Sequence, residues 1–366
     1  MAMDYARRRS AAQAELARLG LDHLIVGPSA DLIYLTGYNA HNFERPTLLV
    51  LPRAGAAYFL VPELEADKAR AAAPDVELRA WSDAEDPWAV VRAGIGAGPC
   101  SIAVSDVMRA SFVLTLQRVL PNATLRPAGG LMGRLRERKE RGEVDALREA
   151  ARRTDEVFDR LCGEPLAGRT EVEVADLIGR HLKAVGLAWK WSYICSVASG
   201  ENSASPHHTL SDRALRAGDA VCVDFGGTFA GYPSDLTRTV HVGPPPEEFR
   251  RVYAVVRDAQ ERAFRAVRPG VAAEQIDRAA RDTIAAAGYG QFFIHRTGHG
   301  LGLEIHETPY IVGGNGQALS AGMVFSVEPG VYLPGNFGVR IEDTVVVTDG
   351  GAERLNGSTR DLRIVR

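Results

Sequence analysis

The sequence has no long apolar run and few cysteines. No stretch approaches the 18 apolar residues that a membrane-spanning helix needs, and no apolar segment follows the arginines near the N-terminus as it would in a secretory signal. The four cysteines, Cys100, Cys162, Cys195 and Cys222, form no CxxC pair and lie far apart. This usage is typical of a reduced protein. The sequence therefore predicts a cytoplasmic protein with no membrane partner.

Strong charge bias is also missing. The 43 basic and 46 acidic residues give a net charge of −3 and are spread along the chain, so nothing in the balance indicates binding to nucleic acid. The motifs GxSxG, GxxxxGK and a GxGxxG between strand and helix are absent, which argues against serine hydrolases and nucleotide-binding enzymes. His306-Glu307 could begin an HExxH zinc motif, but Tyr310 stands in place of the second histidine.

The length and the pattern of the chain predict two domains. A chain of 366 residues exceeds one ordinary domain. Residues 5–20 have the apolar spacing of an amphipathic helix, and residues 24–26, 47–51 and 57–61 read as short strands, which is an α/β beginning. The charged stretch 134–143 then leads into a long helical pattern. We therefore predict domains at 1–130 and 131–366.

The second part of the chain contains a faint internal duplication. Residues 168–175 align without gaps to residues 270–277 at an offset of 102, and residues 217–226 align to residues 321–330 at an offset of 104. In the second alignment Asp224 falls on Glu328. Two related α/β halves, each with an acidic residue at the end of a strand, would bring carboxylates together near a pseudo-twofold axis.

Four carboxylates lie in apolar, strand-like segments. Asp224 and Asp235 are 11 residues apart, and Glu328 and Glu342 are 14 residues apart. Burying one unpaired carboxylate costs several kcal/mol, so a set of four requires protons, cations or basic partners. Two divalent ions would neutralise all four. Any one of these acids alone could equally be a surface residue at a strand end.

Three of the nine histidines lie within residues 295–306, interleaved with glycines. Glycine lets the backbone approach a ligand closely, and an imidazole can bind a metal, carry a proton or donate to an oxyanion. A lone histidine is usually a polar or core residue. The cluster of His295, His299 and His306 therefore carries the chemical signal.

Together these features resemble the pita-bread metallopeptidase family, which includes methionine aminopeptidase, prolidase, aminopeptidase P and the non-peptidase creatinase. The resemblance spans residues 140–350 and keeps the order and spacing of the family's motifs. These motifs are Asp224 and residues 234–238, 298–302, 306–309, 327–330 and 339–343. It implies a pseudo-twofold pita-bread catalytic domain of mixed α/β structure. Residues 31–38 resemble the start of a creatinase-type N-terminal α/β domain, which favours prolidase and aminopeptidase P.

The resemblance also implies the metal ligands and their partners. Carried over position by position, the ligands are Asp224, Asp235, His299, Glu328 and Glu342. An oxygen-rich site with one imidazole suits hard or borderline ions, so two Mn²⁺ ions are expected first, with Co²⁺ or Zn²⁺ as alternatives. Glu328 is also expected to shuttle a proton. Arg340 shares a strand face with Glu342 and is expected to orient a ligand carboxylate.

The family's other active-site histidines fall on His207, His295 and His306. His207 is preferred to its neighbour His208 because its distance from Asn202 matches the family spacing. His295 and His306 are expected to stabilise the tetrahedral oxyanion and to position the substrate.

The predicted activity is hydrolysis of the Xaa-Pro bond of small peptides by a homodimer, with dipeptides favoured. Several prolidases that this chain resembles carry an arginine soon after the HExP segment, where Tyr310 stands here. A hydroxyl is a weaker carboxylate partner than a guanidinium, so the alternative of an aminopeptidase P that acts on longer peptides stays open. A hydrolase or lyase of a small non-peptide substrate and a catalytically silent binding protein are further alternatives.

Overall fold

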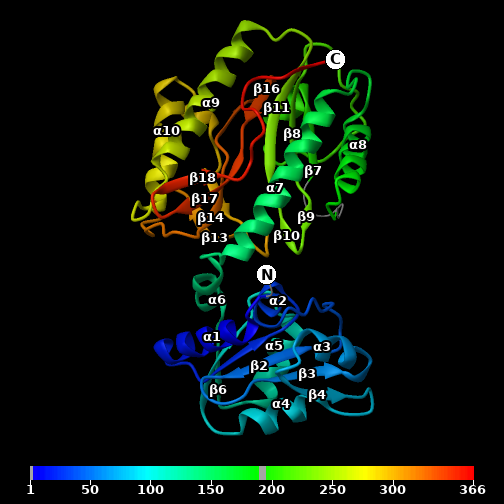
Figure 1. Ribbon diagram of the computed structural model, residues 1–366, viewed down its shortest axis with the longest axis vertical. Coiled ribbons are helices and arrows are strands. Elements are labelled where there is room, and N and C mark those ends of the chain that lie inside the picture. The colour runs from blue at the N-terminus through cyan, green and yellow to red at the C-terminus, as the bar shows by residue number, and fades with distance from the viewer. Residues whose placement is uncertain (1–2, 189–194) are drawn as a thin grey trace. The chain divides into compact units, whose positions relative to one another are not determined.

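The computed structural model describes residues 3–188 and 195–366, and the chain divides into two compact units, Met1–Arg136 and Glu137–Arg366 (Figure 1). Both units mix helices with sheets. The predicted α/β class is therefore confirmed.

The first unit is built on a six-stranded mixed sheet with the strand order β4-β3-β2-β1-β5-β6. The strands are β1 (His23–Val26), β2 (Leu48–Pro52), β3 (Tyr58–Pro62), β4 (Glu77–Trp81), β5 (Cys100–Val104) and β6 (Ala123–Pro127). The helices are α1 (Tyr5–Leu19), α2 (Ala30–Thr36), α3 (Ala66–Ala72), α4 (Pro87–Ile95), α5 (Ala110–Val119) and α6 (Gly129–Arg136). The helix and the three strands predicted here from the sequence are confirmed.

Local sequence explains where α1 begins and ends. The side chain of Asp4 accepts a hydrogen bond from the backbone N–H of Arg7, which caps the helix start. Gly20 ends the helix at φ 66°, a conformation that glycine adopts without a steric penalty. Within the sheet, Ile25 and Leu60 pack in one apolar cluster with Val91 of α4 and Leu116 of α5.

The second unit contains two larger sheets, each packed on a pair of helices (Figure 1). The first half has α7 (Arg141–Cys162), α8 (Glu171–Ala184), β7 (Cys195–Ser199), β8 (Ala220–Phe225) and β11 (Leu236–Val242), with β19 (Ile364–Val365) on its edge. The second half has α9 (Glu247–Ala266), α10 (Ala273–Ala286), β12 (Gly298–Gly300), β13 (Glu307–Ile311), β14 (Val324–Val327), β17 (Asp343–Thr348) and β18 (Gly351–Arg354). Two hairpins, β9 (Thr228–Phe229) with β10 (Tyr232–Pro233) and β15 (Gly330–Leu333) with β16 (Phe337–Arg340), complete the unit.

The two halves repeat each other, as the internal duplication predicted. Helices α8 and α10 have 14 residues each and start 102 positions apart, and β8 and β14 start 104 positions apart. The hydrogen bond from Gly168 N to Leu215 O has its counterpart from Gly270 N to Leu319 O, both 2.8 Å long. Gly168 and Gly270 have φ of 86° and 84°, so both turns need glycine.

Candidate metal centre and active site

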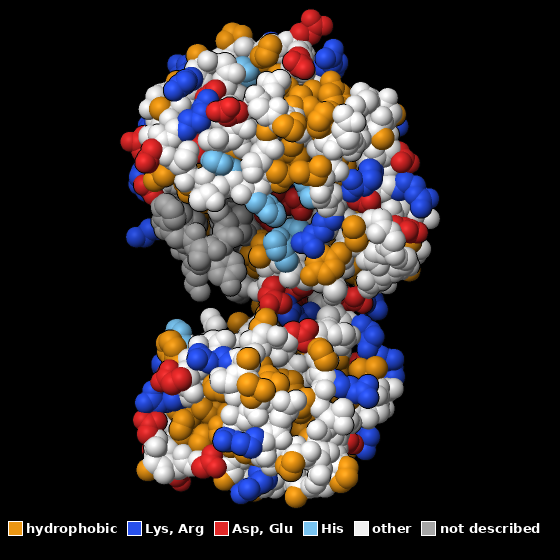
Figure 2. Space-filling view, turned by 180° about the vertical axis from the view of Figure 1, so that it is seen from behind, with side chains coloured by type: hydrophobic (Ala, Val, Ile, Leu, Met, Phe, Trp, Pro, Cys, Tyr) orange, Lys and Arg blue, Asp and Glu red, His pale blue; other side chains and the backbone are white. Residues whose placement is uncertain are grey.

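The five predicted metal ligands all line one cavity of about 600 Å³. Three of them, Asp235, His299 and Glu342, offer ligand atoms that lie within 4.8 Å of one another. The Nε2 atom of His299 lies 3.5 Å from Asp235 Oδ2 and 3.3 Å from Glu328 Oε1. In Figure 2, histidine side chains gather on one face around a hollow in which acidic side chains are visible. Ligand-type side chains from both halves therefore meet at this cavity.

Strand ends deliver the carboxylates. Asp224 lies near the end of β8, opposite Thr237 of β11, and Asp235 directly precedes β11. Glu328 follows β14, and Glu342 directly precedes β17. Because β11 pairs with β8 and β17 pairs with β14, each half brings its two acids side by side.

Two glycines allow His299 to reach this position. A Cβ on Gly298 would lie 1.8 Å from the carbonyl oxygen of Ser326, and one on Gly300 would lie 2.2 Å from that of Thr308. Real Cβ atoms essentially never approach backbone oxygens so closely, so any larger residue would push β12 away from its neighbours. The Gly-His-Gly triplet therefore places the imidazole beside the acids.

The tautomer of His299 suits a metal ligand. Its Nδ1 lies 3.1 Å from the carbonyl oxygen of Gly300. Because a carbonyl only accepts, Nδ1 carries the proton and donates it there, and Nε2 keeps its lone pair towards Asp235 and Glu328. Burial lowers the pKa of His299 to about 3, and the nearby His306 adds to this, so the ring is neutral near pH 7.

The carboxyl groups in the metal-free chain hold their protons strongly. Burial raises the pKa of Asp235 well above its ordinary value, and the charges of Asp224 and Glu328 add to the effect. Burial also raises the pKa of Glu342, and the negative charges of Asp235, Glu328 and Asp224 add to the effect. Burial raises the pKa of Glu328 to about 7, with Arg340 opposing and Asp224 adding to the shift. Such a cluster is stabilised by any group that brings positive charge.

The donor set fits divalent cations. Asp224 Oδ1 is buried and has no hydrogen-bond partner within residues 3–188 and 195–366. The carboxylates of Asp224, Asp235, Glu328 and Glu342 with the single imidazole of His299 make an oxygen-rich ligand set, which hard or borderline ions prefer. A bound cation would account for a buried carboxylate oxygen that has no hydrogen-bond partner and belongs to a cavity lined by three other acids.

Two family descriptions match the chain and cover most of it. Residues 145–349 match Metallopeptidase family M24, and residues 8–138 match the Creatinase/Prolidase N-terminal domain. The chain belongs to metallopeptidase family M24. Membership of this family implies that the chain binds divalent metal.

The M24 chain resembles several named relatives over nearly its full length. It is 46% identical over 365 residues to a protein of Mycobacterium tuberculosis named probable dipeptidase PepE, covering 99% of this chain and 96% of the relative. It is 35% identical to the Xaa-Pro dipeptidase of Lactobacillus helveticus, covering 91% and 92%. The solved prolidase of Thermococcus sibiricus has a TM-score of 0.94 and 40% identity over 99% of both chains. The dipeptidase PepE of Mycobacterium ulcerans has a TM-score of 0.92 and 44% identity over 99% and 98%.

In this M24 chain, Arg340 contacts one predicted ligand directly and another through a hydroxyl. Its Nη2 donates to Asp224 Oδ2 at 2.7 Å, and its Nε donates to Thr237 Oγ1 at 3.1 Å. Thr237 Oγ1 in turn donates to Glu342 Oε2 at 2.6 Å. These are the contacts that the expected orienting role requires. Thr237 was missed from the sequence, although it lies two residues after Asp235 and shares its strand face.

The histidines of the M24 site differ in what their ring nitrogens face. His207, His295 and His306 all line the cavity, and the His306 ring lies edge-on to that of His299 at 4.1 Å between centroids. His295 Nδ1 donates to the carbonyl of Arg296 at 2.7 Å, and its Nε2 lies 2.8 Å from the hydroxyl of Tyr332. Both nitrogens of His295 are therefore engaged by the protein, whereas no protein hydrogen bond to His306 is found in the described part of the chain. Tyr332 is a second residue that the sequence pattern did not single out.

Tyr310 lies outside the residues that line the cavity and is 37% exposed. Its ring lies 4.5 Å from the guanidinium carbon of Arg296, which does line the cavity. Among the described residues, the Arg296 guanidinium has no ion pair. The sequence reading missed Arg296, although it directly follows His295 in the segment of clustered histidines.

Within the described residues, no helix is both long and apolar enough to cross a bilayer.

Proposed function

We propose that this chain is a dinuclear-metal Xaa-Pro dipeptidase. The observation that carries the proposal is the complete set of five ligand-type side chains around one cavity, in a chain whose relatives over nearly the full length are named dipeptidases and prolidases. Asp224, Asp235, His299, Glu328 and Glu342 would hold two Mn²⁺ ions. When bound, such ions lower the pKa of water and polarise a carbonyl group.

The remaining chemistry falls to the chain's own residues. Cleavage before proline releases a nitrogen that carries no N–H in the peptide, so that nitrogen must receive a proton. In our proposal Glu328 carries this proton from the attacking water. His306 donates to the oxyanion, which is supported by the lack of a hydrogen bond to its ring from any residue that the structure describes. His207, which lines the same cavity, contacts the substrate, and His295 holds the hydroxyl of Tyr332 and the carbonyl of Arg296 in place.

A positive charge at the cavity supports a substrate with a free carboxylate close to the scissile bond. Arg296 and His306 both line the cavity. Burial is the larger cause that lowers the pKa of His306, and the positive charge of Arg296 lowers it further. In our proposal Arg296, held over the ring of Tyr310, attracts the C-terminal carboxylate of a dipeptide. This takes the place of the arginine that is missing at position 310.

The proposal also includes the assembly and the division of the chain. We propose a homodimer in which residues 1–130 form an N-terminal domain and residues 131–366 form the catalytic domain. Size-exclusion chromatography with light scattering measures the assembly directly. A monomeric mass for the active protein would contradict this part of the proposal.

A substrate panel tests the activity. The Mn²⁺-reconstituted protein is incubated with Ala-Pro, Ala-Ala, Ala-Pro-Ala, Met-Ala and creatine. Release of the first residue is followed for the peptides, and loss of the compound is followed for creatine. We expect Ala-Pro to be cleaved fastest. Faster cleavage of Ala-Pro-Ala would point to an aminopeptidase P, and turnover of creatine alone would point to a small-molecule hydrolase. Equal rates on Ala-Pro and Ala-Ala would contradict Xaa-Pro specificity.

A further inference from the structure

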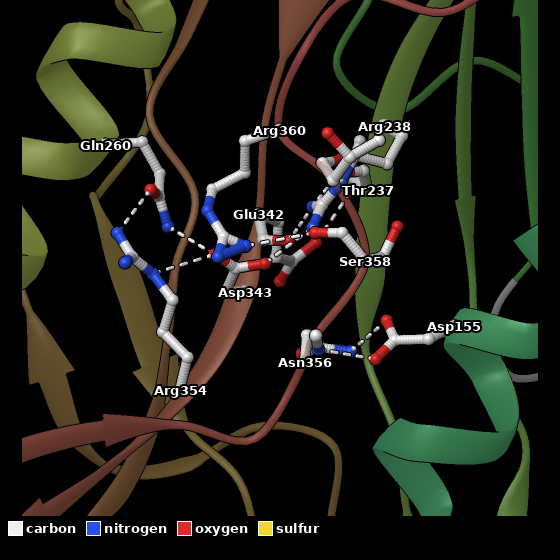
Figure 3. Close-up of polar contacts among 12 residues, drawn as sticks. Asp155, Thr237, Arg238, Gln260, Glu342, Asp343, Arg354, Asn356, Ser358 and Arg360 are labelled. Atoms are coloured by element: carbon white, nitrogen blue, oxygen red, sulfur yellow. Dashed lines mark hydrogen bonds and ion pairs between the residues drawn. The ribbon is translucent and has the colours of Figure 1, made fainter.

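A fully buried arginine lies directly behind the ligand cluster. Arg238 of β11 is 1% exposed, and Asp343, the first residue of β17, is 0% exposed. Because side chains alternate along a strand, Arg238 points away from the face that Thr237 shares with Asp235, and Asp343 points away from Glu342. Figure 3 shows Arg238, Asp343 and their partners close to Glu342.

Every N–H of the Arg238 guanidinium has an acceptor. Nη2 donates to Asp343 Oδ1 at 2.7 Å and to the carbonyl of Ser358 at 3.1 Å, and Nε donates to the carbonyl of Thr359 at 2.9 Å. Nη1 donates to the carbonyls of Thr237, at 3.0 Å, and of Glu342. These five bonds use the full donor capacity of an arginine, which no other side chain can match.

The bonds of Arg238 join three segments that are far apart in the sequence. The backbone of Glu342 is tied to β11 at both polar groups, because its N–H donates to the carbonyl of Thr237 at 3.0 Å and its carbonyl accepts from Arg238. The C-terminal segment 355–360 supplies the other two carbonyls. That segment is itself held by Asp155 of α7, which accepts from Asn356 Nδ2 at 3.2 Å and from Gly357 N at 2.6 Å (Figure 3).

Asp343 is held from its other side as well. Its Oδ2 accepts from Gln260 Nε2 of α9 at 2.9 Å, and lies 3.2 Å from Arg354 Nε and 3.5 Å from Arg360 Nη1. The carboxylate therefore cannot turn to follow Arg238 if that side chain changes. A rigid partner on a rigid strand gives Arg238 one allowed position.

We propose that Arg238 is a positioning residue for the metal centre, which sets the separation between Asp235 on the first half and Glu342 on the second by fixing the Glu342 backbone to β11 and to residues 355–360. The inference rests on the proposed ligand set and is independent of the proposed substrate. Groups outside the ligands commonly change metal affinity by about 10–100-fold when they are removed.

The test compares Mn²⁺ affinities of full-length variants. Metal-free protein is titrated with Mn²⁺ in a calorimeter at 25 °C, and the melting temperature of each metal-free variant is measured beside it. In Arg238→Lys, a single ammonium group replaces a guanidinium that makes five hydrogen bonds. We therefore expect Mn²⁺ to bind at least about tenfold more weakly. Arg360→Lys is the matched control, since Arg360 faces the same carboxylate but makes no bond to Glu342; its affinity should stay within about twofold.

A second variant keeps the inference testable if Arg238→Lys does not fold. Asp343→Asn preserves the shape and an oxygen acceptor while removing the charge that orients Arg238, and we expect an intermediate loss of Mn²⁺ affinity. A purely structural role for Arg238 predicts a lower melting temperature with unchanged affinity in the folded protein, and that result would overturn the inference. If the unmodified protein bound no Mn²⁺, this result would contradict the proposed ligand set and therefore also the role of Arg238.

Discussion

The ring Nε2 of His208 lies 2.7 Å from Oε2 of Glu171, a carboxylate that is fully buried at the start of α8. Glu171 also accepts from the backbone and hydroxyl groups of Ser199 and Ser211 and from Asn202. Burial acts to raise the pKa of Glu171, but hydrogen bonds led by Asn202 and Ser211 lower it to about 2. The carboxylate of Glu171 therefore holds the segment that carries His207 in place.

We expect the two neighbouring histidines to behave differently. His208→Ala removes a donor from a buried carboxylate and should lower the free energy of unfolding by about 1–3 kcal/mol. His207→Ala, which alters a side chain lining the cavity, should leave that free energy within about 0.5 kcal/mol and reduce turnover. Urea unfolding and steady-state kinetics on both variants separate the two effects. The reverse pattern would assign the active-site role to His208.

Removal of the metal should abolish peptide hydrolysis. In the proposed mechanism the attacking water is activated by the metal that the four carboxylates and His299 would hold. We expect activity to disappear after dialysis against a chelator and to return with Mn²⁺ or Co²⁺. Metal bound only to the folded state should stabilise it by about 2.7 kcal/mol at a hundredfold excess over the dissociation constant. Full activity in protein shown by elemental analysis to be metal-free would contradict the mechanism.

The effect of the metal on stability should grow as pH rises towards 7. The pKa of Glu328 in the metal-free protein is about 7, above its ordinary 4.5, so the folded state binds more protons than the unfolded state between these values. The metal-free protein therefore loses stability as pH rises through this range. Metal needs the deprotonated carboxylate, so its affinity rises over the same range. Melting temperatures of both forms from pH 5 to 8 should diverge; a constant difference would argue against this coupling.

Metal occupancy should separate His306 from Asp235. His306→Ala should keep its metal but lose about 10²–10³-fold in turnover, the usual loss when an oxyanion donor is removed. Asp235→Ala should lose metal as well, because its carboxylate belongs to the ligand cluster with His299 and Glu342. Elemental analysis of both purified variants gives the answer. An empty site in His306→Ala with a full one in Asp235→Ala would reverse these roles.

The contribution of Arg296 should depend on the charge of the substrate. Arg296→Gln should raise KM for Ala-Pro by about tenfold, as expected for a lost charge-assisted hydrogen bond of about 1.4 kcal/mol. It should change KM much less for Ala-Pro amide, which lacks the C-terminal carboxylate. Arg268→Gln, at an exposed position, is the control and should leave both constants unchanged. Equal effects on the two substrates would remove Arg296 from carboxylate recognition.

The α/β class and the two related halves could be predicted from the sequence, which also offered a candidate set of metal-binding residues. Periodicity and turn residues are local signals, so α1 and the strands β1, β2 and β3 could be read within a residue or two. The match at offset 104 placed Asp224 on Glu328, and the structure brings these two strand ends to one cavity. Acids in apolar strands and histidines between glycines are unusual enough to stand out in one chain.

The surroundings of those candidate ligands could not be predicted from local sequence, because distant segments supply them. The bonds of Arg238 reach residues more than 100 positions away, and Glu171 gathers donors up to 40 positions away. Arg296 meets Tyr310 only because β12 and β13 lie side by side. Such partners carry no local pattern, because an arginine or a glutamate in a strand or helix looks the same whether it faces water or a buried carbonyl. Their roles follow from which strands and loops pack together, which the periodicity of one chain does not encode.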